Sequence, residues 1–254
     1  MISFEPIAFF RCSSKFKHEQ PRQAVFSENH GFIEFLKDKG FENGLRNLDG
    51  FDRIWIIFNF HHTSNWKALV TPPVNDGNGR KGVFATRSPH RPNSVGLSCC
   101  KIIKIEQNKI FVEQSDLLDG TPILDIKPYI KDSDCFPDAK RGWLDNIDAK
   151  KFAISFNHIA KKKIAFLQNY GVDLNNVINT QLQVNPTEFR RKRIIRNDNN
   201  FTLKFRLWRI NFQILENIIK IEDVYSGYLE EELLAMEDPY EDKELHRVFN
   251  REWK

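Results

Sequence analysis

The first half of the chain alternates short apolar runs with turn residues. Each run is bounded by Gly, Pro, Asn or Asp, a pattern that predicts β-strands joined by tight turns. Helical periodicity is nearly absent apart from a short turn between Phe41 and Leu48, so repeated βαβ units are not expected. The predicted strands are residues 7–10, 54–60, 83–85, 95–105, 110–112 and 123–126. This spacing is typical of a barrel or a sandwich.

Beyond residue 145 the pattern changes to helical spacing. Residues 149–170 carry apolar side chains about every three or four positions with lysines between them, and Gly171 is a suitable C-cap. A second helix is expected over 174–184, because the residue before Pro186 disfavours the helical conformation. The second half therefore begins with a pair of helices.

Strands are expected again after the two helices. Residues 201–207 alternate apolar and polar side chains, a bend is expected near Asn217, and residues 218–225 form a returning strand. The tail 230–244 is rich in Glu and Asp, which favours an exposed helix or a frayed terminus over an interaction tail. We therefore expect two domains, a mainly β domain over residues 1–145 and a small α+β domain over residues 146–254.

The composition is that of a soluble globular protein. Of the 254 residues, 41% are hydrophobic and 28% are charged, and 22 Phe against only 2 Met predict an aromatic-heavy core. No apolar run approaches the roughly 18 residues of a membrane span, and the N-terminus lacks a signal-peptide pattern, so a cytoplasmic location without membrane contact is expected. The net charge of +4 permits an anionic partner without requiring one.

The four cysteines lack the paired spacing of a zinc site. Cys99 and Cys100 are direct neighbours, and Cys12 and Cys135 lie far from them in the sequence. We expect buried, reduced thiols and no bound metal.

Residues 79–98, GRKGVFATRSPHRPNSVGLS, hold the densest set of candidate binding residues. Arg87, His90 and Arg91 stand among prolines, which restrict the backbone and hold guanidinium groups in place at a low entropic cost. Such a loop suits carboxylate or phosphate recognition, although a proline-rich turn with solvated arginines has the same composition. The density of the motif favours a binding role.

A second motif, residues 116–129 (DLLDGTPILDIKPY), places Asp119 and Gly120 at a predicted turn between two strands. Asp119 could accept hydrogen bonds from the ammonium or hydroxyl groups of a ligand, or it could serve only to form the turn.

A third candidate follows the apolar strand 54–60, which ends at His61 and His62. Either histidine could act as a base or as a hydrogen-bonding ligand, although a satisfied core histidine is the commoner case. Adjacent side chains of a strand point to opposite faces, so a metal site from these two alone is not expected.

The common catalytic signatures are absent from the sequence. It holds no GxGxxG, GxxxxGK[ST], GxSxG, HExxH or kinase motif, so the usual nucleotide-fold, hydrolase, metalloprotease and phosphoryl-transfer assignments have no support. The glycines within residues 76–79 are explained by a hairpin turn.

With these motifs the chain resembles the TsaA-like family of tRNA N6-methyltransferases, which act on threonylcarbamoyladenosine beside the anticodon. The resemblance covers the first half almost continuously. It departs from the family pattern at Ser94-Val95, where the family usually has Pro-Ile, and at His62, where it usually has Gln. The segments that carry the resemblance are Pro21-Arg22-Gln23, residues 51–62 (FDRIWIIFNFHH), residues 79–98 and residues 116–129.

The resemblance implies a compact N-terminal β-barrel that binds S-adenosylmethionine without a Rossmann fold, usually as a homodimer with its site close to the subunit interface. Arg87 would pair with the methionine carboxylate, Leu97 would cover the adenine, and Asp119 would accept from the ribose or the ammonium group. Asp119 and His61 are also the candidates for a base that takes the proton of the acceptor nitrogen. The implied cofactor contacts are Pro21, Arg22, Gln23, His61, His62, Arg87, Leu97, Asp119, Gly120, Thr121 and Pro122.

The second half resembles the bacterial C-terminal extension of the family more weakly. The usual Asp-Pro-Arg-Pro-Ala-Tyr segment is replaced by Asn185-Pro186-Thr187-Glu188-Phe189, and a basic run follows it. Such cations suit phosphates and the Phe ring suits an unpaired base, although a solvated loop has the same composition. The candidate RNA-binding residues are Arg91, Phe189, Arg190, Arg191, Lys192, Arg193 and Arg196.

The resemblance therefore implies an S-adenosylmethionine-dependent methyltransferase that acts on N6 of threonylcarbamoyladenosine, at the position 3′ to the anticodon, by direct in-line transfer. The tRNA anticodon stem-loop would be its partner. Two alternatives remain from the residues alone. One is a non-catalytic β-barrel that binds S-adenosylmethionine or RNA. The other is a methyltransferase with a different acceptor, which the altered segment 185–189 favours.

Overall fold

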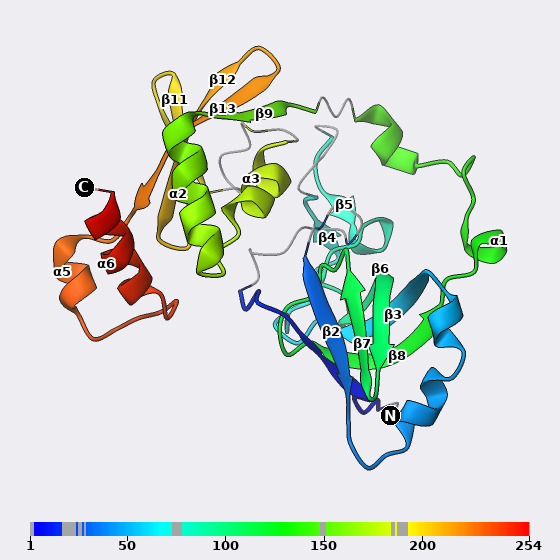
Figure 1. Cartoon of the computed structure of the whole chain (residues 1–254). Coiled ribbons are helices and arrows are strands. Elements are labelled where there is room, and N and C mark those ends of the chain that lie inside the picture. The colour runs from blue at the N-terminus through cyan, green and yellow to red at the C-terminus, as the bar shows by residue number, and fades with distance from the viewer. Residues whose placement is uncertain are drawn as a thin grey trace. The chain divides into compact units, whose positions relative to one another are not determined.

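The computed structural model of the protein divides into two compact units, Met1–Asp148 and Ala149–Lys254 (Figure 1). No helix of the part that the structure describes is long and apolar enough to cross a membrane. The described residues are 3–16, 24, 27, 29–72, 78–147, 151–183, 186 and 193–253.

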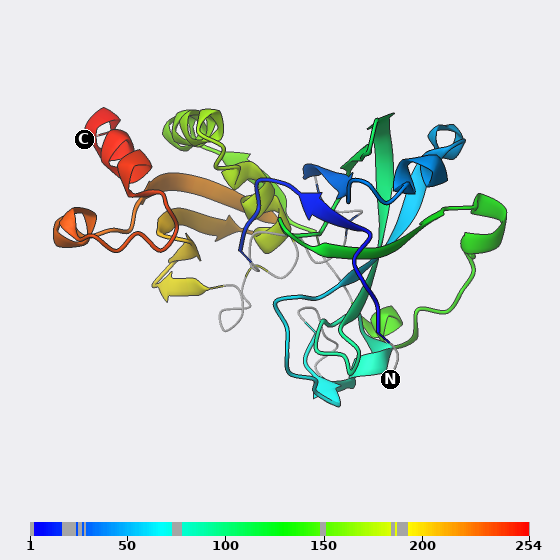
Figure 2. The ribbon, with the colours of Figure 1, turned by 90° about the horizontal axis from the view of Figure 1, so that it is seen from below.

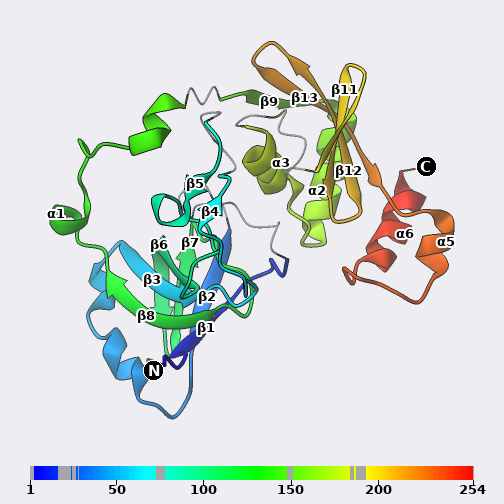
Figure 3. The ribbon, with the colours of Figure 1, turned by 180° about the vertical axis from the view of Figure 1, so that it is seen from behind.

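Six strands of the first unit close into a barrel in the order β1-β2-β7-β6-β3-β8. Every neighbouring pair is antiparallel. Figure 3 shows β8 between β3 and β1 in the barrel wall. The predicted N-terminal β-barrel is confirmed. The strands are β1 (Ala8–Arg11), β2 (His30–Phe35), β3 (Arg53–Asn59), β6 (Val95–Glu106), β7 (Lys109–Glu113) and β8 (Pro122–Pro128).

Alternating burial explains why these segments form strands. In β3, Ile54, Ile56 and Phe58 are buried inside the barrel, and the residues between them are half-buried on its outside. Gly96 of β6 lies opposite Phe58, where a Cβ atom would come within 2.3 Å of the Phe58 ring. Large side chains therefore fill the interior, as in other small barrels, and a ligand site is expected at a rim or on the outer face.

Some local predictions for the first half are wrong. Residues 83–85 form the 3-10 helix η4 (Val83–Ala85) instead of a strand, because only Val83 is buried and the next two side chains are exposed. The strands β2, β4 (Leu69–Val70) and β5 (Lys81–Gly82) were not predicted. Two residues, as in β4 and β5, are too few to show a period. The turn expected between Phe41 and Leu48 is present as η2 (Phe41–Leu45), and η3 (Leu48–Gly50) follows it.

The cysteines are free thiols, but they are not all buried. Cys100 is buried, Cys12 and Cys99 are half-buried, and Cys135 is exposed. The prediction of four buried thiols is therefore wrong for Cys135, which directly follows the short surface helix α1 (Lys131–Asp134).

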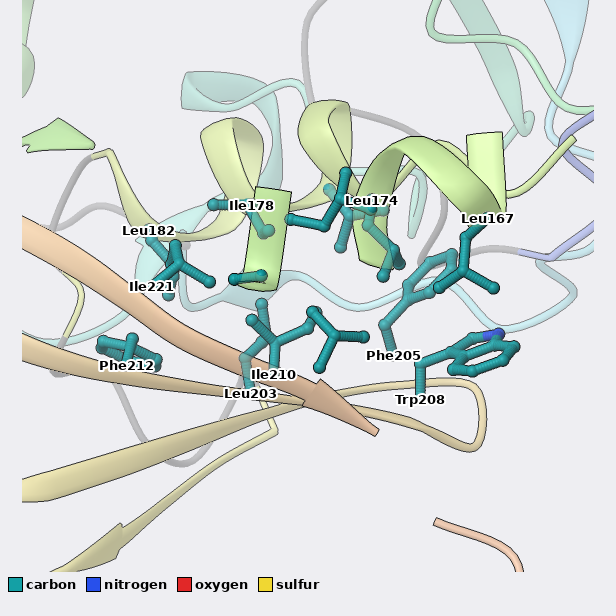
Figure 4. Close-up of a cluster of buried hydrophobic side chains, with 14 of the residues drawn as sticks. Leu167, Leu174, Ile178, Leu182, Leu203, Phe205, Trp208, Ile210, Phe212 and Ile221 are labelled. Carbon is teal, nitrogen blue, oxygen red and sulfur yellow. The ribbon is translucent and has the colours of Figure 1, made fainter. Parts of the chain in front are cut away.

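The second unit is a five-stranded sheet in the order β10-β11-β12-β13-β9, with helices α2 (His158–Asn169) and α3 (Leu174–Leu182) over one face (Figures 2 and 4). In Figure 4, Leu167 and Ile178 from the helices meet Ile210 from the sheet in a cluster of buried apolar side chains. The smaller α+β unit is thus confirmed. Its strands are β9 (Ala153–Phe156), β10 (Ile194–Asn197), β11 (Asn200–Phe205), β12 (Trp208–Leu215) and β13 (Ile218–Ser226).

The helix predicted over 149–170 is shorter than expected. Residues 153–156 form β9, which pairs with β13 in parallel, and α2 begins only after Asn157. The Asn157 side chain caps the helix by accepting a hydrogen bond from the Ala160 N–H at 2.7 Å. The apolar residues of β9 alternate over only four positions directly before α2, so the sequence pattern does not distinguish this strand from the first turn of a helix.

The predicted strand over 201–207 also needs correction. The chain turns already at Arg206, whose φ is 48°, so residues 200–215 form the two strands β11 and β12. The bend at 216–217 then joins β12 to β13 as expected. The helix over residues 174–184 is confirmed as α3.

The acidic tail is folded, and it is neither frayed nor fully solvated. It forms α5 (Glu230–Leu234), and α6 (Lys243–Glu252) begins before its end. Asp242 and Lys243 are buried in spite of the like charges around them. The expected exposed helix is confirmed for α5, in which only Leu233 is buried, whereas the end of the tail is held in the fold as the start of α6.

Candidate functional site

One rim of the barrel gathers the described segments that carry candidate cofactor residues. Asn59 at the end of β3 pairs with Val95 at the start of β6, and Phe58 pairs with Ile123 near the start of β8. Because antiparallel neighbours run in opposite directions, the end of β3 and the starts of β6 and β8 lie at the same rim. That rim carries His61 and His62, the loop from Thr86 to Ser94, and residues 119–122.

His61 and His62 lie in a turn beyond β3. The His61 N–H donates to the Asn59 carbonyl at 2.8 Å, and the centroids of the two imidazole rings are 3.9 Å apart. Both residues are exposed. The prediction that they point to opposite faces of a strand is wrong, because the strand ends at Asn59. Within the described ranges, no three His, Cys, Asp or Glu side chains gather into a group that could hold a metal.

Arg91 fixes the loop between η4 and β6. Its guanidinium donates to the carbonyls of Val83 at 3.3 Å and Thr86 at 3.0 Å, and lies 5.7 Å from the centroid of the Phe84 ring. The Arg91 side chain therefore joins the loop to η4. Arg87 of the same loop is exposed at the rim.

Asp116, a half-buried carboxyl that the motifs did not single out, is within electrostatic range of Arg87. Asp116 accepts a hydrogen bond from the Ser98 hydroxyl at 2.5 Å, and the Ala24 backbone N–H also bonds to it. Burial raises the pKa of Asp116 above the ordinary value, while the Ser98 hydrogen bond and the positive charge of Arg87 act in the opposite direction. This pair joins an anion-binding group to a carboxyl with a raised proton affinity.

The sequence contains one signal that could have found this pair. Gly96, Ser98 and Cys100 share the inward face of β6, so a hydroxyl there must find a partner inside the barrel. The partner, Asp116, lies 18 positions further along the chain. A period of two identifies the inward serine but not the carboxyl that it meets.

Asp119 bonds to the backbone at the end of β1. Its Oδ1 accepts from the Cys12 N–H at 3.1 Å, and its own N–H donates to the Ser14 carbonyl at 2.8 Å. Gly120 follows with φ of 74°, in the left-handed region, and the buried Thr121 donates its hydroxyl to the Leu118 carbonyl at 2.7 Å. These bonds hold the start of β8, including Pro122, against β1.

Leu97 lies on the outer face of the barrel and is 57% exposed. Because neighbouring residues of a strand point to opposite sides, Leu97 points away from Ser98 and from the barrel interior. Val95 is exposed on the same outer face of β6, and Ile103 is exposed further along the same strand. The predicted contacts Pro21, Arg22 and Gln23 lie outside the described residues.

The predicted RNA-binding residues of the second unit are described only in part. Arg193 directly precedes β10 and Arg196 lies in it, and both are exposed. Arg196 donates from Nε to the Asp198 carbonyl at 3.0 Å. Of the altered segment 185–189, the structure describes only Pro186, which is buried. Phe189, Arg190, Arg191 and Lys192 lie outside the described residues.

Comparison with known proteins relates both units to one family. The family model described as tRNA-methyltransferase O N-terminal domain matches residues 9–135. The chain is 33% identical over 198 residues to the tRNA (adenine(37)-N6)-methyltransferase of Escherichia coli K12, which covers 75% of this chain and 84% of that protein. It is 41% identical over 135 residues to the mouse protein of the same name, covering 51% of this chain but only 31% of the mouse protein.

A third relative and a solved structure extend this similarity. A probable S-adenosyl-L-methionine-binding protein of Pyrococcus abyssi is 33% identical over 169 residues, covering 63% of this chain and 90% of that protein. The crystal structure of TrmO from Pseudomonas aeruginosa superposes with a TM-score of 0.65 at 25% identity and covers 89% of this chain and 98% of that one. The chain therefore belongs to the TrmO family, whose N-terminal domain is the barrel described above.

Proposed function

We propose that this protein transfers a methyl group from S-adenosylmethionine to N6 of an adenosine in tRNA, and that the acceptor is threonylcarbamoyladenosine at the position 3′ to the anticodon. The observation that carries the proposal is the barrel rim, where the charge of the exposed Arg87 acts on the half-buried carboxyl of Asp116, which is bonded to the Ser98 hydroxyl. The relatives that align along this barrel are named tRNA (adenine(37)-N6)-methyltransferase.

The residues of the rim fit the chemistry of S-adenosylmethionine. Arg87 supplies a guanidinium that can pair with the methionine carboxylate, and the exposed Leu97 supplies an apolar surface for the adenine. The turn at Asp119 and Gly120 exposes polar backbone and carboxylate groups near the same rim, which suits the ammonium or the ribose. When bound, S-adenosylmethionine supplies an electrophilic methyl group that a nitrogen can accept by in-line displacement.

The acceptor nitrogen has to lose a proton, because it is conjugated to both a purine and a carbonyl and is a weak nucleophile. Asp116 is the best-placed proton acceptor of the three acidic and histidine candidates at the rim. Burial raises its proton affinity, whereas the Asp119 carboxylate is bonded to the Cys12 N–H. His61 is exposed in a turn beyond β3. Water exclusion and alignment of the two substrates would supply much of the remaining rate.

Cations of the second unit suit the tRNA. Exposed Arg193 and Arg196 at β10, with the basic run before them in the sequence, suit the phosphates of an anticodon stem-loop. Arg91 serves primarily to fix its own loop. The departure from the usual segment at 185–189 makes the identity of the acceptor the most informative part of the proposal to test.

We also propose that the protein acts as a homodimer. Val95 and Leu97 are exposed apolar residues on the outer face of β6 close to the rim, and Ile103 is exposed further along the same strand. A second copy that covered these residues would bury apolar surface and would bring a second chain next to the cofactor. Light scattering of the purified protein would give the mass directly.

The deciding experiment is transfer of a labelled methyl group to total tRNA from cells that lack this protein, followed by mass analysis of the nucleosides. Label on threonylcarbamoyladenosine is the expected result. Label on another nucleoside would show that the proposed acceptor is wrong and that the protein is still a methyltransferase. Cofactor binding by calorimetry without any transfer would instead leave a binding protein of the same fold.

A further inference from the structure

Three segments beside the cofactor rim are joined into one surface of the first unit. The Lys67 N–H donates to the His90 carbonyl at 3.1 Å, and the Val83 N–H donates to the Ala68 carbonyl at 2.9 Å. The indole Nε1 of Trp143, in η5 (Gly142–Asn146), donates to the Ala85 carbonyl at 2.9 Å. Residues 65–70, 80–91 and 142–146 are therefore held together by hydrogen bonds to the backbone.

Two large aromatic rings stand exposed on this surface. Phe84 is 75% exposed and Trp66 is 56% exposed. The Phe84 ring is not on a loose loop, since η4 fixes its backbone and the bonded guanidinium of Arg91 lies 5.7 Å from its centroid. Exposed aromatic side chains on a fixed backbone lose little entropy when they stack on a planar ligand.

Charges of a single sign lie along the two longer segments that carry these rings, whereas the third segment contains Asp145, which lies 3.8 Å from Arg141. In residues 60–72 and 78–94, which the structure describes, there are five Lys or Arg side chains and neither Asp nor Glu. This local density contrasts with the nearly balanced chain, which has 38 basic and 34 acidic residues in all. The five cations are Lys67, Arg80, Lys81, Arg87 and Arg91.

The cations are positioned by the same segments as the rings. Arg80 donates to the Leu69 carbonyl at 2.8 Å, and Lys81 lies with Nζ 5.6 Å from the centroid of the Trp143 ring. A guanidinium has five N–H groups and an ammonium has three, and both groups suit the oxygens of a phosphate. We call Trp66, Lys67, Arg80, Lys81 and Phe84 the aromatic-basic surface.

Exposed aromatic rings interleaved with cations are the recognition chemistry of unpaired nucleotides, since bases stack on the rings and phosphates pair with the cations. A second protein copy would be favoured by an apolar surface of low charge, which is the character of the exposed apolar residues on β6 and not of this surface. The charge and the aromatic content together favour RNA as the occupant.

We propose that the aromatic-basic surface binds unpaired nucleotides of the RNA substrate next to the methyl-acceptor base, with Phe84 and Trp66 as stacking platforms. This inference rests on the proposed function and deepens it, because it places recognition of the RNA on the first unit beside the cofactor rim. Lys81, Arg80 and Lys67 contact the phosphates of the same nucleotides.

The test compares Phe84→Ala with Phe136→Ala in binding of a fluorescently labelled anticodon stem-loop RNA, measured by anisotropy. Phe136 is 72% exposed in the same unit but follows Asp132 and Asp134 and precedes Asp138. We expect Phe84→Ala to weaken binding about tenfold, because a base stacked on an aromatic ring contributes roughly 1–3 kcal/mol. Phe136→Ala should bind as the unchanged protein does.

A second pair of measurements separates stacking from charge. Lys81→Ala should reduce the slope of log affinity against log salt by about one, whereas Phe84→Ala and Trp66→Ala should leave that slope unchanged. S-adenosylmethionine affinity by calorimetry should be the same in all four variants, which also reports that the barrel is folded.

Several outcomes would overturn the inference. Equal RNA affinities of Phe84→Ala, Trp66→Ala and Phe136→Ala would do so, as would no RNA binding by the unchanged protein. A change of oligomeric state in Phe84→Ala, without a change in RNA affinity, would make this surface a contact between copies. If the protein transfers methyl groups but Phe84→Ala leaves its RNA affinity unchanged, the proposed RNA surface is refuted and the proposed function stands. If Phe84→Ala weakens RNA binding but the protein transfers no methyl group, the proposed function is refuted and the RNA surface stands.

Discussion

Each unit of the chain places a buried or partly buried aspartate beside a hydroxyl-bearing side chain, and the surroundings of the two carboxyls differ. Asp116 of the first unit meets the Ser98 hydroxyl at a barrel rim, where the positive charge of the exposed Arg87 acts on it. Asp242 of the second unit meets the Tyr228 hydroxyl at 3.4 Å and the His246 Nε2 at 3.6 Å in the interior.

The second cluster contains the residue types of a nucleophilic site but cannot admit a substrate. The His246 Nδ1 lies 2.8 Å from the Ser226 Oγ, yet His246 is 0% exposed. Its ring stacks on Trp208 with a centroid distance of 3.7 Å and an interplanar angle of 14°. Burial and the neighbouring Asp242 raise the pKa of Tyr228, which keeps this phenol neutral.

The difference teaches that buried polarity alone does not identify a functional site. At the rim, the carboxyl is within electrostatic range of the exposed Arg87. Behind Trp208, a similar set of groups joins α6 to the sheet, where Asp242 Oδ2 and His246 Nε2 are buried without a hydrogen-bond partner among the described residues. Access to solvent, and not the residue types, separates the candidate site from the structural cluster.

Replacement of Trp208 is expected to have the largest effect, because it tests whether the Asp242 cluster is structural. Trp208→Ala removes a fully buried indole that packs on His246 and Phe249, so we expect a loss of about 3–5 kcal/mol in the free energy of unfolding of the second unit. Hydrogen exchange followed by mass spectrometry would resolve this loss unit by unit. Cofactor affinity should persist, and its loss would show that the two clusters are not independent.

Asp116→Asn tests the rim cluster at nearly constant shape. Removal of a proton acceptor should reduce methyl transfer by about a hundredfold or more while cofactor still binds. The matched variant Asp119→Asn retains an oxygen for the Cys12 N–H and should lose much less. Equal losses in the two variants would contradict the assignment of the base to Asp116.

The same variant has a defined dependence of stability on pH. Because burial raises the pKa of Asp116 in the folded state, this group loses stabilising free energy as pH rises from about 4, the ordinary value, through its raised value. Asn does not titrate, so the stability of Asp116→Asn relative to the unchanged protein should increase between pH 4 and pH 7. Thermal unfolding at a series of pH values would measure this difference in stability. A relative stability of Asp116→Asn that falls over the same range would contradict the raised pKa of Asp116.

Arg87→Ala should weaken S-adenosylmethionine binding by about tenfold or more, since a hydrogen bond to a charged group contributes about 1.5–3 kcal/mol. Calorimetry measures the affinity directly. Arg141→Ala is a suitable control, because that arginine is also exposed in the first unit and pairs only loosely, at 3.8 Å, with Asp145. An unchanged affinity in Arg87→Ala would remove the carboxylate contact from the proposed site.

The sequence predicts the elements whose burial pattern is regular and long. β3 alternates over its seven residues and β6 over its first six, and α3 lies between a clear cap and a proline, so each was expected. β9 was missed because its four residues run directly into α2, and the period of two is lost in the helical pattern. Short elements are fixed by their partners in the sheet, which a single sequence does not reveal.

The candidate site divides in the same way. The loop with Arg87 and the turn with Asp119 carry compact motifs and were identified from them. The pairing of Ser98 with Asp116 depends on the barrel closing, and the bond from Asp119 to Cys12 spans 107 positions of the chain. Local sequence therefore predicts which segments form the site, whereas the contacts between segments decide the role of each side chain.

The smallest expected effects come from replacing the serine of each cluster, Ser226 in the second unit and Ser98 in the first. Ser226→Ala removes a hydrogen bond to His246 and one from the Tyr228 N–H, so it should cost about 1 kcal/mol of stability in the second unit and leave cofactor affinity unchanged. Ser98→Ala removes the hydroxyl that opposes the raised pKa of Asp116, so that pKa should rise further and the pH profile of methyl transfer should move to higher pH. Urea unfolding and the pH dependence of transfer, measured on both variants, give four results. Two results would contradict this explanation: a shift of the pH profile of methyl transfer in Ser226→Ala, or an unchanged profile in a Ser98→Ala variant that is only less stable. In either case, access to solvent would not explain why the Asp116 cluster is catalytic and the Asp242 cluster is structural.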